Sequence, residues 1–246
     1  MAHRIIRYLF LATLLLLAVA IWRKDVLPES KFIQEKLLLE PAQQAIQSTP
    51  ITTSVGEIEY KIQPLYEYKL YGLVVSRHDS DTWWDYIHKA ANDKLNVADL
   101  CVIWGDNLHN ESYRNIAFSS GQFTCNFGSS SWEVWEAFDK NAVSNNHLLT
   151  DKPALAKKIR NARIGDQIHV RGYLAEYSHN QGFPFKRGTS TTRTDTGNGA
   201  CETIYVESFE ILQRGDTLWL TLLRLAIFML FAEVIAWFVI PMRVGD

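Results

Sequence analysis

The sequence lacks the short motifs by which enzymes and metal-binding proteins are commonly identified. Its seven histidines include no His-x-x-x-His pair, and its three cysteines form no closely spaced pair. These two absences exclude the usual sequence signatures of a zinc site. No internal repeat or low-complexity tract is present either, which excludes an array of stacked repeats.

Basic residues are neither in excess nor clustered. The chain has 25 Lys and Arg against 27 Asp and Glu, and residues 23–215 keep a similar balance of 21 against 24. Binding to nucleic acid requires a concentrated basic face. We therefore expect no nucleic-acid partner.

Apolar residues, by contrast, are concentrated at the two ends of the chain. Residues 5–22 read IIRYLFLATLLLLAVAIW, with Arg7 as the only charge. At about 1.5 Å per residue in a helix, this run is just long enough to span a thin hydrocarbon core. The alternative is a cleaved secretory signal, because Ala18-Val19-Ala20 has the small-x-small form of a cleavage site. Either interpretation exports the residues that follow.

The second apolar run, residues 218–240, predicts a transmembrane helix. Trp219 and Trp237 lie near its ends, where aromatic rings favour the headgroup level. Its only charges are Arg224 and Glu233, and a charge near the bilayer centre costs about 2.5–3.5 kcal/mol. We expect both side chains to contact a membrane partner, with the N-terminal helix as an alternative neighbour of Glu233. The alternative for Arg224 is that its long side chain reaches towards one interface, since it lies six residues after Leu218.

Two spanning segments would put both termini on the same side of the lipid bilayer. The simplest arrangement is a bacterial inner membrane with both termini in the cytoplasm and the main domain in the periplasm. The chain then divides into an N-terminal transmembrane anchor or signal peptide (1–24), a juxtamembrane helix and linker (25–55), an exported α+β domain (56–215) and a C-terminal transmembrane helix (216–241).

The exported region predicts short helices mixed with strands. Apolar spacing indicates a juxtamembrane helix or stalk that begins near Pro28 and ends near Pro41, and helices at 131–138 and 153–162. Alternation indicates strands at 57–62, 66–76 and 98–104. Residues 164–178 and 200–213 are the clearest strands, with Gly172 in the middle of the first. This arrangement is typical of a small OB-like β-barrel, in which a midstrand glycine permits tight coiling. We therefore expect an α+β domain with an OB-like barrel as its core.

The three cysteines are Cys101, Cys125 and Cys201. In an oxidising compartment they would give one disulfide and one remaining thiol. Cys101 and Cys125 lie in strand-like runs and form our preferred pair. The alternative is that all three are small buried apolar residues.

A first candidate site contains Asp81, Asp85 and His88, which a helix would align on one face. Carboxylates and an imidazole could hold a divalent metal, and a metal-assisted hydrolase could add His147 as a general base. The alternative, which we favour, is a solvated polar face. We accordingly expect no metal and no cofactor.

A second candidate site is the segment 187–202, which reads RGTSTTRTDTGNGACE. Guanidinium groups, hydroxyls and exposed amides could bind an anion or a partner here. An Asp-Thr-Gly tripeptide matches that of aspartic proteases, but it does not follow an apolar strand, so we reject that interpretation. The alternative is an ordered loop in which hydroxyls satisfy backbone groups. The candidate contacts are Arg187, Ser190, Arg193, Asp195 and Asn198.

Four stretches resemble a family of bacterial membrane proteins that have an exported domain and no established activity. These stretches are YKIQPLYEYKLYGLVVS, DLCVIWGDN, SNNHLL and RGTSTTRTDTGNGACE. The resemblance implies a protein of the bacterial envelope and implies no particular chemistry.

Taken together, these patterns favour a non-enzymatic accessory or assembly subunit of an envelope complex. It would lie in the bilayer beside other membrane-protein subunits or further copies of itself, and its exported domain would bind a partner protein or an envelope ligand. A metal-assisted hydrolase of the periplasm and a sensor of an anion or other small ligand are the alternatives.

Overall fold

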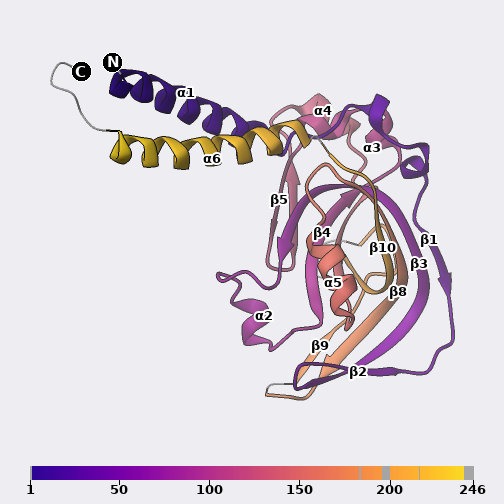
Figure 1. The fold of residues 1–246 in the computed structure, drawn as a ribbon. Helices are drawn as coiled ribbons and strands as arrows, with labels where there is room; N and C mark the ends of the chain where they lie inside the picture. Colours follow the sequence, from indigo (N-terminus) through magenta and orange to yellow (C-terminus); the bar gives the residue numbers. More distant parts are fainter. Residues whose placement is uncertain (1, 183, 196–199, 216, 241–246) are drawn as a thin grey trace. The chain divides into compact units, whose positions relative to one another are not determined.

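The computed structural model describes residues 2–182, 184–195, 200–215 and 217–240 (Figure 1). The chain forms two compact units. One contains residues 1–26 and 216–246, and the other is Leu27–Gly215. The second unit mixes a large sheet with short helices, and the first consists of two apolar helices.

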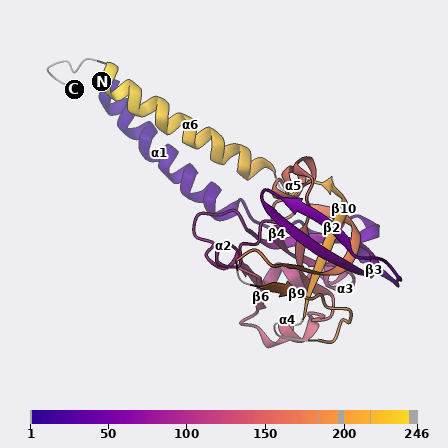
Figure 2. The same ribbon diagram turned by 90° about the horizontal axis from the view of Figure 1, so that it is seen from below.

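The helical unit pairs α1 (Ala2–Arg23) with α6 (Thr217–Val239). The two helices pack along each other, as Figure 2 shows. Both are long and apolar enough to cross a membrane. Their outer faces leave large apolar side chains exposed, among them Leu15, Phe228 and Phe238, as expected of helices surrounded by lipid.

Within the described residues the sheet contains eight strands. They are β1 (Ala42–Ala45), β2 (Ile51–Val55), β3 (Ile58–Asp79), β4 (Asn96–Ile103), β7 (Val143–Leu149), β8 (Gln167–His179), β9 (Phe185–Arg187) and β10 (Cys201–Gln213).

The pairing of the central strands returns to its starting point. Strand β3 pairs with β4, β4 with β7, β7 with β10, β10 with β8, and β8 again with β3. Only the β7–β10 pairing among these is parallel. The remaining strands are attached outside this cycle, β1 and β2 to β3 and β9 to β8.

Short elements cover this sheet. They are the helices α2 (Ile87–Ala90), α3 (Asp106–His109), α4 (Trp132–Ala137) and α5 (Pro153–Arg160), the 3-10 turns η1 (Ser30–Phe32), η2 (Glu35–Leu38) and η3 (Ser112–Asn115), and a hairpin of β5 (Ala117–Gly121) and β6 (Thr124–Gly128). One apolar core lies between the sheet and α5, where Leu155 and Ile159 are buried. Another lies between the sheet and the β5–β6 hairpin with α4. The hairpin therefore forms a lid over one face of the sheet.

Two expectations from the sequence are wrong in detail. The juxtamembrane segment before Pro41 forms the 3-10 turns η1 and η2 instead of one helix, and strand β1 follows Pro41. Tertiary contacts override the helical pattern, because Leu37 is buried in the core under the hairpin and its carbonyl accepts from the backbone N–H of Gly105. The strands predicted at 57–62 and 66–76 are parts of the single strand β3. Its pairing with β8 continues through Pro64, with a register shift between Pro64 and Tyr66.

A glycine is needed where β8 approaches β10. A Cβ added at Gly172 would lie 2.1 Å from the carbonyl oxygen of Tyr205 on the paired strand. That oxygen belongs to the backbone of a buried strand, so it cannot turn away as a flexible side chain could. The two strands can approach this closely only because residue 172 has no side chain.

We therefore predict that Gly172→Ala destabilises the protein by about 2 kcal/mol or more, since an overpacked site must push its neighbours apart. Thermal unfolding of the full-length protein in detergent would measure the change. Gly128→Ala is the matched control, because a Cβ there meets no heavy atom within 4 Å. Equal melting temperatures for the two variants would contradict this account of Gly172.

Candidate functional site

Three neighbouring strands place an aspartate, a histidine and a cysteine on one face of the sheet. Asp99 of β4 lies directly opposite His147 of β7. On the other side of β7, Cys201 of β10 lies opposite Asn145, two residues before His147. Directly opposed residues, and residues two apart along a strand, project from the same face. The register of the sheet therefore brings these four side chains together.

Asp99 and His147 form a fully buried pair. The Nδ1 atom of His147 lies 2.6 Å from Oδ1 of Asp99, and neither side chain has exposed surface. Burial opposes the ionisation of Asp99, but the charge and hydrogen bond of His147 outweigh it and lower the pKa of Asp99 to about 2. Burial likewise opposes a charge on His147, and Asp99 raises the pKa of His147 above its ordinary value.

The second oxygen of Asp99 is also satisfied. The backbone N–H of Phe123, in the turn between β5 and β6, donates to Oδ2 of Asp99 at 2.8 Å. The amide of Asn96 donates to Oδ1 at 2.8 Å. These bonds hold the carboxylate so that it keeps Nδ1 of His147 protonated and leaves Nε2 facing the other way.

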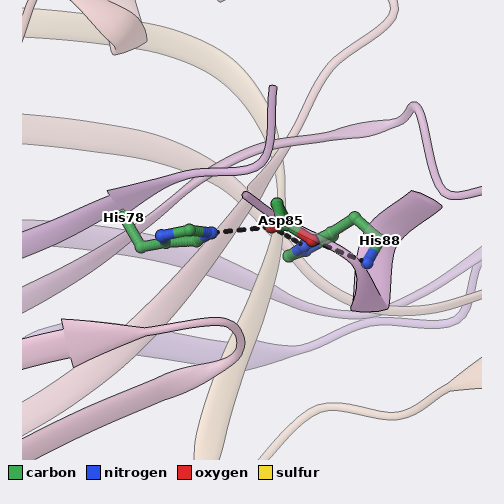
Figure 3. Close-up of side chains that lie close together, drawn as sticks. All are labelled: His78, Asp85 and His88. Carbon is green, nitrogen blue, oxygen red and sulfur yellow. Dashed lines mark hydrogen bonds and ion pairs between the residues drawn. The ribbon is translucent and has the colours of Figure 1, made fainter. Parts of the chain in front are cut away.

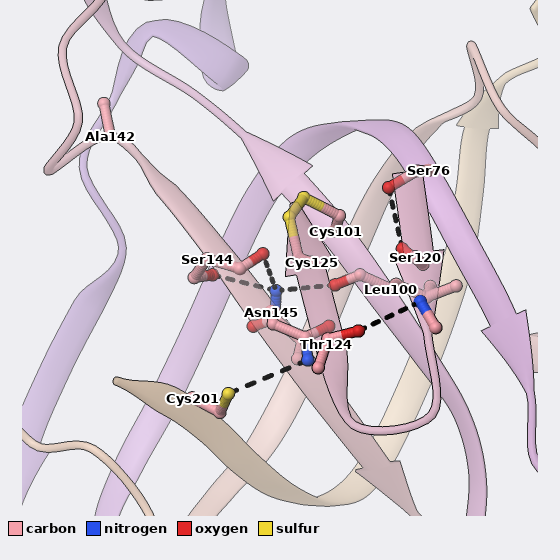
Figure 4. The surroundings of a disulfide bond; sticks show 12 residues. Ser76, Leu100, Cys101, Ser120, Thr124, Cys125, Ala142, Ser144, Asn145 and Cys201 are labelled. Atoms are coloured by element: carbon pink, nitrogen blue, oxygen red, sulfur yellow. Dashed lines mark hydrogen bonds between the residues drawn. A yellow bond between two sulfur atoms is a disulfide. The ribbon is translucent and has the colours of Figure 1, made fainter. Parts of the chain in front are cut away.

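Cys201 carries a free, partly buried thiol beside this pair. Nδ2 of Asn145 lies 3.7 Å from its sulfur atom (Figure 4). Burial raises the pKa of the Cys201 thiol, but hydrogen bonding to His147, the charge of His147 and the Asn145 amide lower it below its ordinary value. A thiol in such surroundings is more reactive than an isolated buried cysteine, because the thiolate is the nucleophile.

Arg187 of β9 completes the surroundings of His147. Its Nη2 lies 2.6 Å from Nε2 of His147, and its guanidinium lies 3.9 Å from the centre of the Phe123 ring. A guanidinium can only donate, so this hydrogen bond forms while His147 is neutral, and the charge of Arg187 partly offsets the rise in the pKa of His147 that Asp99 causes. When His147 takes up a proton, Nε2 becomes a donor and its partner must be an acceptor, such as the Cys201 thiolate.

Phe123, Asn145, Arg187 and Cys201 border a cavity of about 790 Å³. The β5–β6 hairpin forms one wall through Phe123 and Cys125, and other walls carry charged and polar side chains. The polar lining includes Gln122, Lys140, Ser144, Asn145, Arg187, Arg193, Asp195, Cys201 and Glu202.

Two of the most buried side chains that line the cavity have an oxygen atom without a hydrogen-bond partner among the described residues. These atoms are Oδ1 of Asn145 and Oε2 of Glu202, in residues that are 5% and 3% exposed. Burial raises the pKa of Glu202 to about 7, although the charge of Arg193 opposes the shift. Unpaired buried acceptors are costly, so a ligand with donor groups would satisfy them.

The structure brings together most of the loop residues predicted from the sequence. Arg193 binds Glu202 and donates to the hydroxyl of Tyr68 at 3.1 Å. Ser190 donates to the carboxylate of Asp195 at 2.8 Å. Of this group, Arg187, Arg193 and Asp195 line the cavity. Ser190 is buried and supports the loop, and Asn198 lies outside the described residues.

A disulfide joins Cys101 of β4 to Cys125 of β6 (Figure 4). Cys101 is fully buried and lies opposite Asn145 in the sheet, whereas Cys125 lines the cavity. The bond fastens the hairpin to the sheet directly beside the site. It therefore holds Phe123 in place over Asp99 and His147.

The first candidate site differs from the prediction, because Asp85 and His88 lie beside His78 and not beside Asp81. Asp85 and His88 are buried and lie next to His78, whereas Asp81 is exposed. The predicted helical alignment is wrong, because the only helix in this segment, α2, begins at Ile87. Figure 3 shows the Asp85 carboxylate between the two rings, with both nitrogens 2.6 Å from Oδ2.

The hydrogen bonds of this cluster fit a polar network better than a metal site. The Asn96 amide donates to Nε2 of His88 at 2.9 Å while it also donates to Asp99. His88 must then carry its proton on Nδ1, the atom that faces Asp85, and a protonated nitrogen cannot bind a metal. Burial opposes ionisation of Asp85, but hydrogen bonds from His78 and His88 lower its pKa. Asn96 thus connects this cluster to the Asp99–His147 pair.

In the helical unit, Glu233 and Arg224 have different surroundings. The hydroxyl of Thr13 in α1 donates to Oε1 of Glu233 at 2.8 Å, while Oε2 has no partner within the part of the chain that the structure describes. Glu233 lies in a largely apolar groove that Ile6, Arg7 and Trp237 also line. Arg224 is exposed.

Comparison with protein-family models, curated proteins and solved structures finds no match to this chain. The assignment of the site therefore depends on its own geometry. The sequence did suggest His147 as a general base and left Cys201 as the third cysteine, but it did not connect either residue with Asp99. A local signal is present for Asp99 and Cys201, which lie in apolar or alternating runs where a buried polar residue is unusual. His147 follows the polar run Ser144-Asn145-Asn146 and carries no such signal.

The Asp99–His147 pair makes a prediction about pH. His147 has a raised folded-state pKa, so its contribution to stability is present below the unfolded value of about 6.5 and is lost as pH rises through the folded value. We expect Asp99→Asn to destabilise the protein by on the order of 3 kcal/mol near pH 6 and by less at pH 10. Melting temperatures of both proteins across this range would test this. A difference that does not shrink with pH would contradict it.

Proposed function

We propose that this protein is a membrane-anchored, periplasmic ligand-binding protein whose site is the cavity over β4, β7 and β10. The ligand is a small anion that also carries O–H or N–H donors. The observation that carries this proposal is the pair of buried, unpartnered oxygens of Asn145 and Glu202 in a cavity that Arg187 also lines. A cavity of this size, largely preformed and with a few convergent polar groups, is the usual form of a small-molecule site.

The ligand's charge and donors are inferred from the cavity walls. Arg187 and Lys140 supply positive charge, and the guanidinium of Arg187 can bind a carboxylate or phosphate through two parallel hydrogen bonds. Arg193 is already engaged by Glu202, so it supports the wall and does not add a free cation. The two unpartnered oxygens are acceptors, and they would select a ligand with hydroxyl or amino groups.

The proposed architecture is an OB-like barrel. The pairing order β3–β4–β7–β10–β8–β3, with its one parallel pair, supports this, because closure of five strands in Greek-key order defines that fold. The midstrand approach at Gly172 is the kind of tight coiling that closure requires. Ligands of such barrels bind on the face of their second and third strands, which correspond here to β4 and β7.

The proposed location is the periplasm of a bacterial inner membrane, with both termini in the cytoplasm. Helices α1 and α6, each able to span a bilayer, support the anchoring. The Cys101–Cys125 disulfide supports an oxidising compartment, since such bonds are rare in the cytosol.

Thermal unfolding of the full-length protein in detergent with added anions would test the ligand class. Malate and succinate are a matched pair, because malate differs by one hydroxyl, and phosphate provides a second type of anion. We expect malate or phosphate to raise the melting temperature with concentration, by about 2–4 °C for each kcal/mol of binding energy. Succinate should act more weakly than malate.

The variant Arg187→Gln should lose most of this shift. Lys157→Gln is the control, because Lys157 is an exposed residue of α5 and does not line the cavity. Equal shifts in both variants, or no shift with any of the three anions at millimolar concentrations, would contradict the proposed site.

A second function, assembly with a membrane partner, is supported by Glu233. A carboxylate in an apolar groove with one unpartnered oxygen would be stabilised by a donor from another transmembrane helix. The partner would be another membrane-protein subunit or a further copy of this chain.

Affinity purification in mild detergent, followed by mass spectrometry and chemical cross-linking, would test this assembly. We expect a stoichiometric partner or dimer that is lost with Glu233→Leu and kept with Val239→Leu, a change at an exposed apolar position of the same helix. A partner-free monomer before and after the Glu233→Leu change would contradict the assembly function.

A further inference from the structure

We propose that Cys201 is the nucleophile of an acyl-transfer site, with His147 as its general acid and base and Asp99 as a positioning residue. The substrate class is an ester or thioester that carries a negatively charged group. This inference rests on the ligand-binding cavity proposed above and adds a reaction to it.

The spatial order of Asp99, His147 and Cys201 across the sheet supports acyl transfer. The Asp99 carboxylate lies 2.6 Å from Nδ1 of His147, which leaves Nε2 as the only nitrogen able to exchange a proton with a reacting group. The Cys201 thiol lines the cavity and donates to the backbone carbonyl of Phe123 at 3.9 Å. Cys201 lies on the strand beside that of His147, opposite Asn145. A nucleophile, a base and a residue that orients the base therefore lie in sequence across three adjacent strands, which is the arrangement that nucleophilic catalysis requires.

A hydrogen-bond donor, the Asn145 amide, lies beside the sulfur atom of Cys201. Nδ2 of Asn145 lies 3.7 Å from Sγ of Cys201, and the residue is buried. When a carbonyl carbon bonds to Sγ, its oxygen comes within reach of such an amide. A donor fixed in advance at the place where negative charge develops stabilises the tetrahedral intermediate.

The position of Arg187 implies that the substrate carries a negative charge. In its contact with Nε2 of His147, the guanidinium occupies the position that the Cys201 proton needs. A carboxylate or phosphate on the substrate would draw Arg187 away, because a charged acceptor binds a guanidinium more strongly than a neutral imidazole does. Nε2 would then be free to accept the thiol proton. Binding of an anionic substrate would thus activate the nucleophile.

The groups that face His147 fit this sequence of events. The β4 side provides Asp99, β9 provides Arg187, and β10 provides Cys201. From the β5–β6 hairpin, the uncharged ring of Phe123 packs on His147 at a centroid distance of 5.2 Å. This ring excludes water from the pair, which strengthens its electrostatic interactions.

The proposed reaction proceeds in two half-steps. Cys201 gives its proton to Nε2 of His147, and its sulfur forms a bond to the carbonyl carbon while the carbonyl electrons move to oxygen. Collapse of this intermediate breaks the bond to the leaving oxygen or sulfur, which takes the proton from His147. Water then attacks the thioester in the same way, and the proton returns through His147 to Cys201. An ester and water thereby become a carboxylic acid and an alcohol, and a thioester and water become a carboxylic acid and a thiol.

Two chromogenic acetate esters can test the proposal on the full-length protein in detergent. 4-Nitrophenyl acetate is neutral, and 3-carboxy-4-nitrophenyl acetate is the matched anionic ester. We expect a burst of product equal to the protein concentration and an acetyl group on the peptide that contains Cys201. The anionic ester should react roughly tenfold faster, and Arg187→Gln should remove this preference.

Variants of the other residues separate catalysis from folding. His147→Gln should slow acetylation about 10²-fold or more. Asp99→Asn should move the midpoint of the pH profile to a lower pH, because the pKa of His147 falls and the ring is then in its neutral, proton-accepting form at lower pH. Cys201→Ser should lose the acetylated peptide. Acetylation that is unchanged in Cys201→Ser, or a pH profile unchanged in Asp99→Asn, would overturn the proposal.

The outcome also distinguishes this proposal from the ligand-binding function. A wild-type protein that shows the anion shift but forms no acetyl–Cys201 adduct with either ester would overturn acyl transfer and leave ligand binding standing. A protein that shows the adduct but no anion shift would overturn the ligand class instead.

Discussion

The Asp99 carboxylate of β4 lies 2.6 Å from the His147 imidazole of β7, and neither side chain has any exposed surface. Placing two ionisable groups in the interior costs several kcal/mol per ion, and their attraction offsets this only when the remaining hydrogen bonds are satisfied. Around Asp99 they are satisfied by Asn96 and by the backbone of Phe123. The positions of the strands, the hairpin and the neighbouring cluster therefore all depend on this one pair, since a shift of any of them would leave a buried charge without its partner.

The elements around the Asp99–His147 pair are held in place by a disulfide and by side-chain contacts. The Cys101–Cys125 disulfide holds the β5–β6 hairpin against β4, and the hairpin keeps Phe123 in contact with both His147 and Arg187. Asn96 extends the network to His88 and Asp85. The cavity with Cys201 lies on the side of His147 away from Asp99, so the buried charge influences a thiol that ligands can reach.

Much of the secondary structure could be predicted, because burial on one face leaves an alternating pattern in strands such as β8 and β10. The continuity of β3 through Pro64 could not, since only its pairing with β8 keeps that segment extended. The site was less predictable still. Asp99, His147 and Cys201 are far apart in the chain, and the parallel register of β7 with β10 that unites them depends on long-range pairing. Asp81 shows the opposite error, in which a local helical spacing grouped an exposed residue with Asp85.

Nuclear magnetic resonance of the isotope-labelled histidine rings is the most direct test of the central claim, that Asp99 holds a proton on His147. The His147 signals are identified as those absent from His147→Gln, and their pH titration gives the pKa of the ring. The account predicts a His147 pKa well above the ordinary value of about 6.5, which falls in Asp99→Asn. A His147 ring that titrates at or below the ordinary value in both proteins would contradict it.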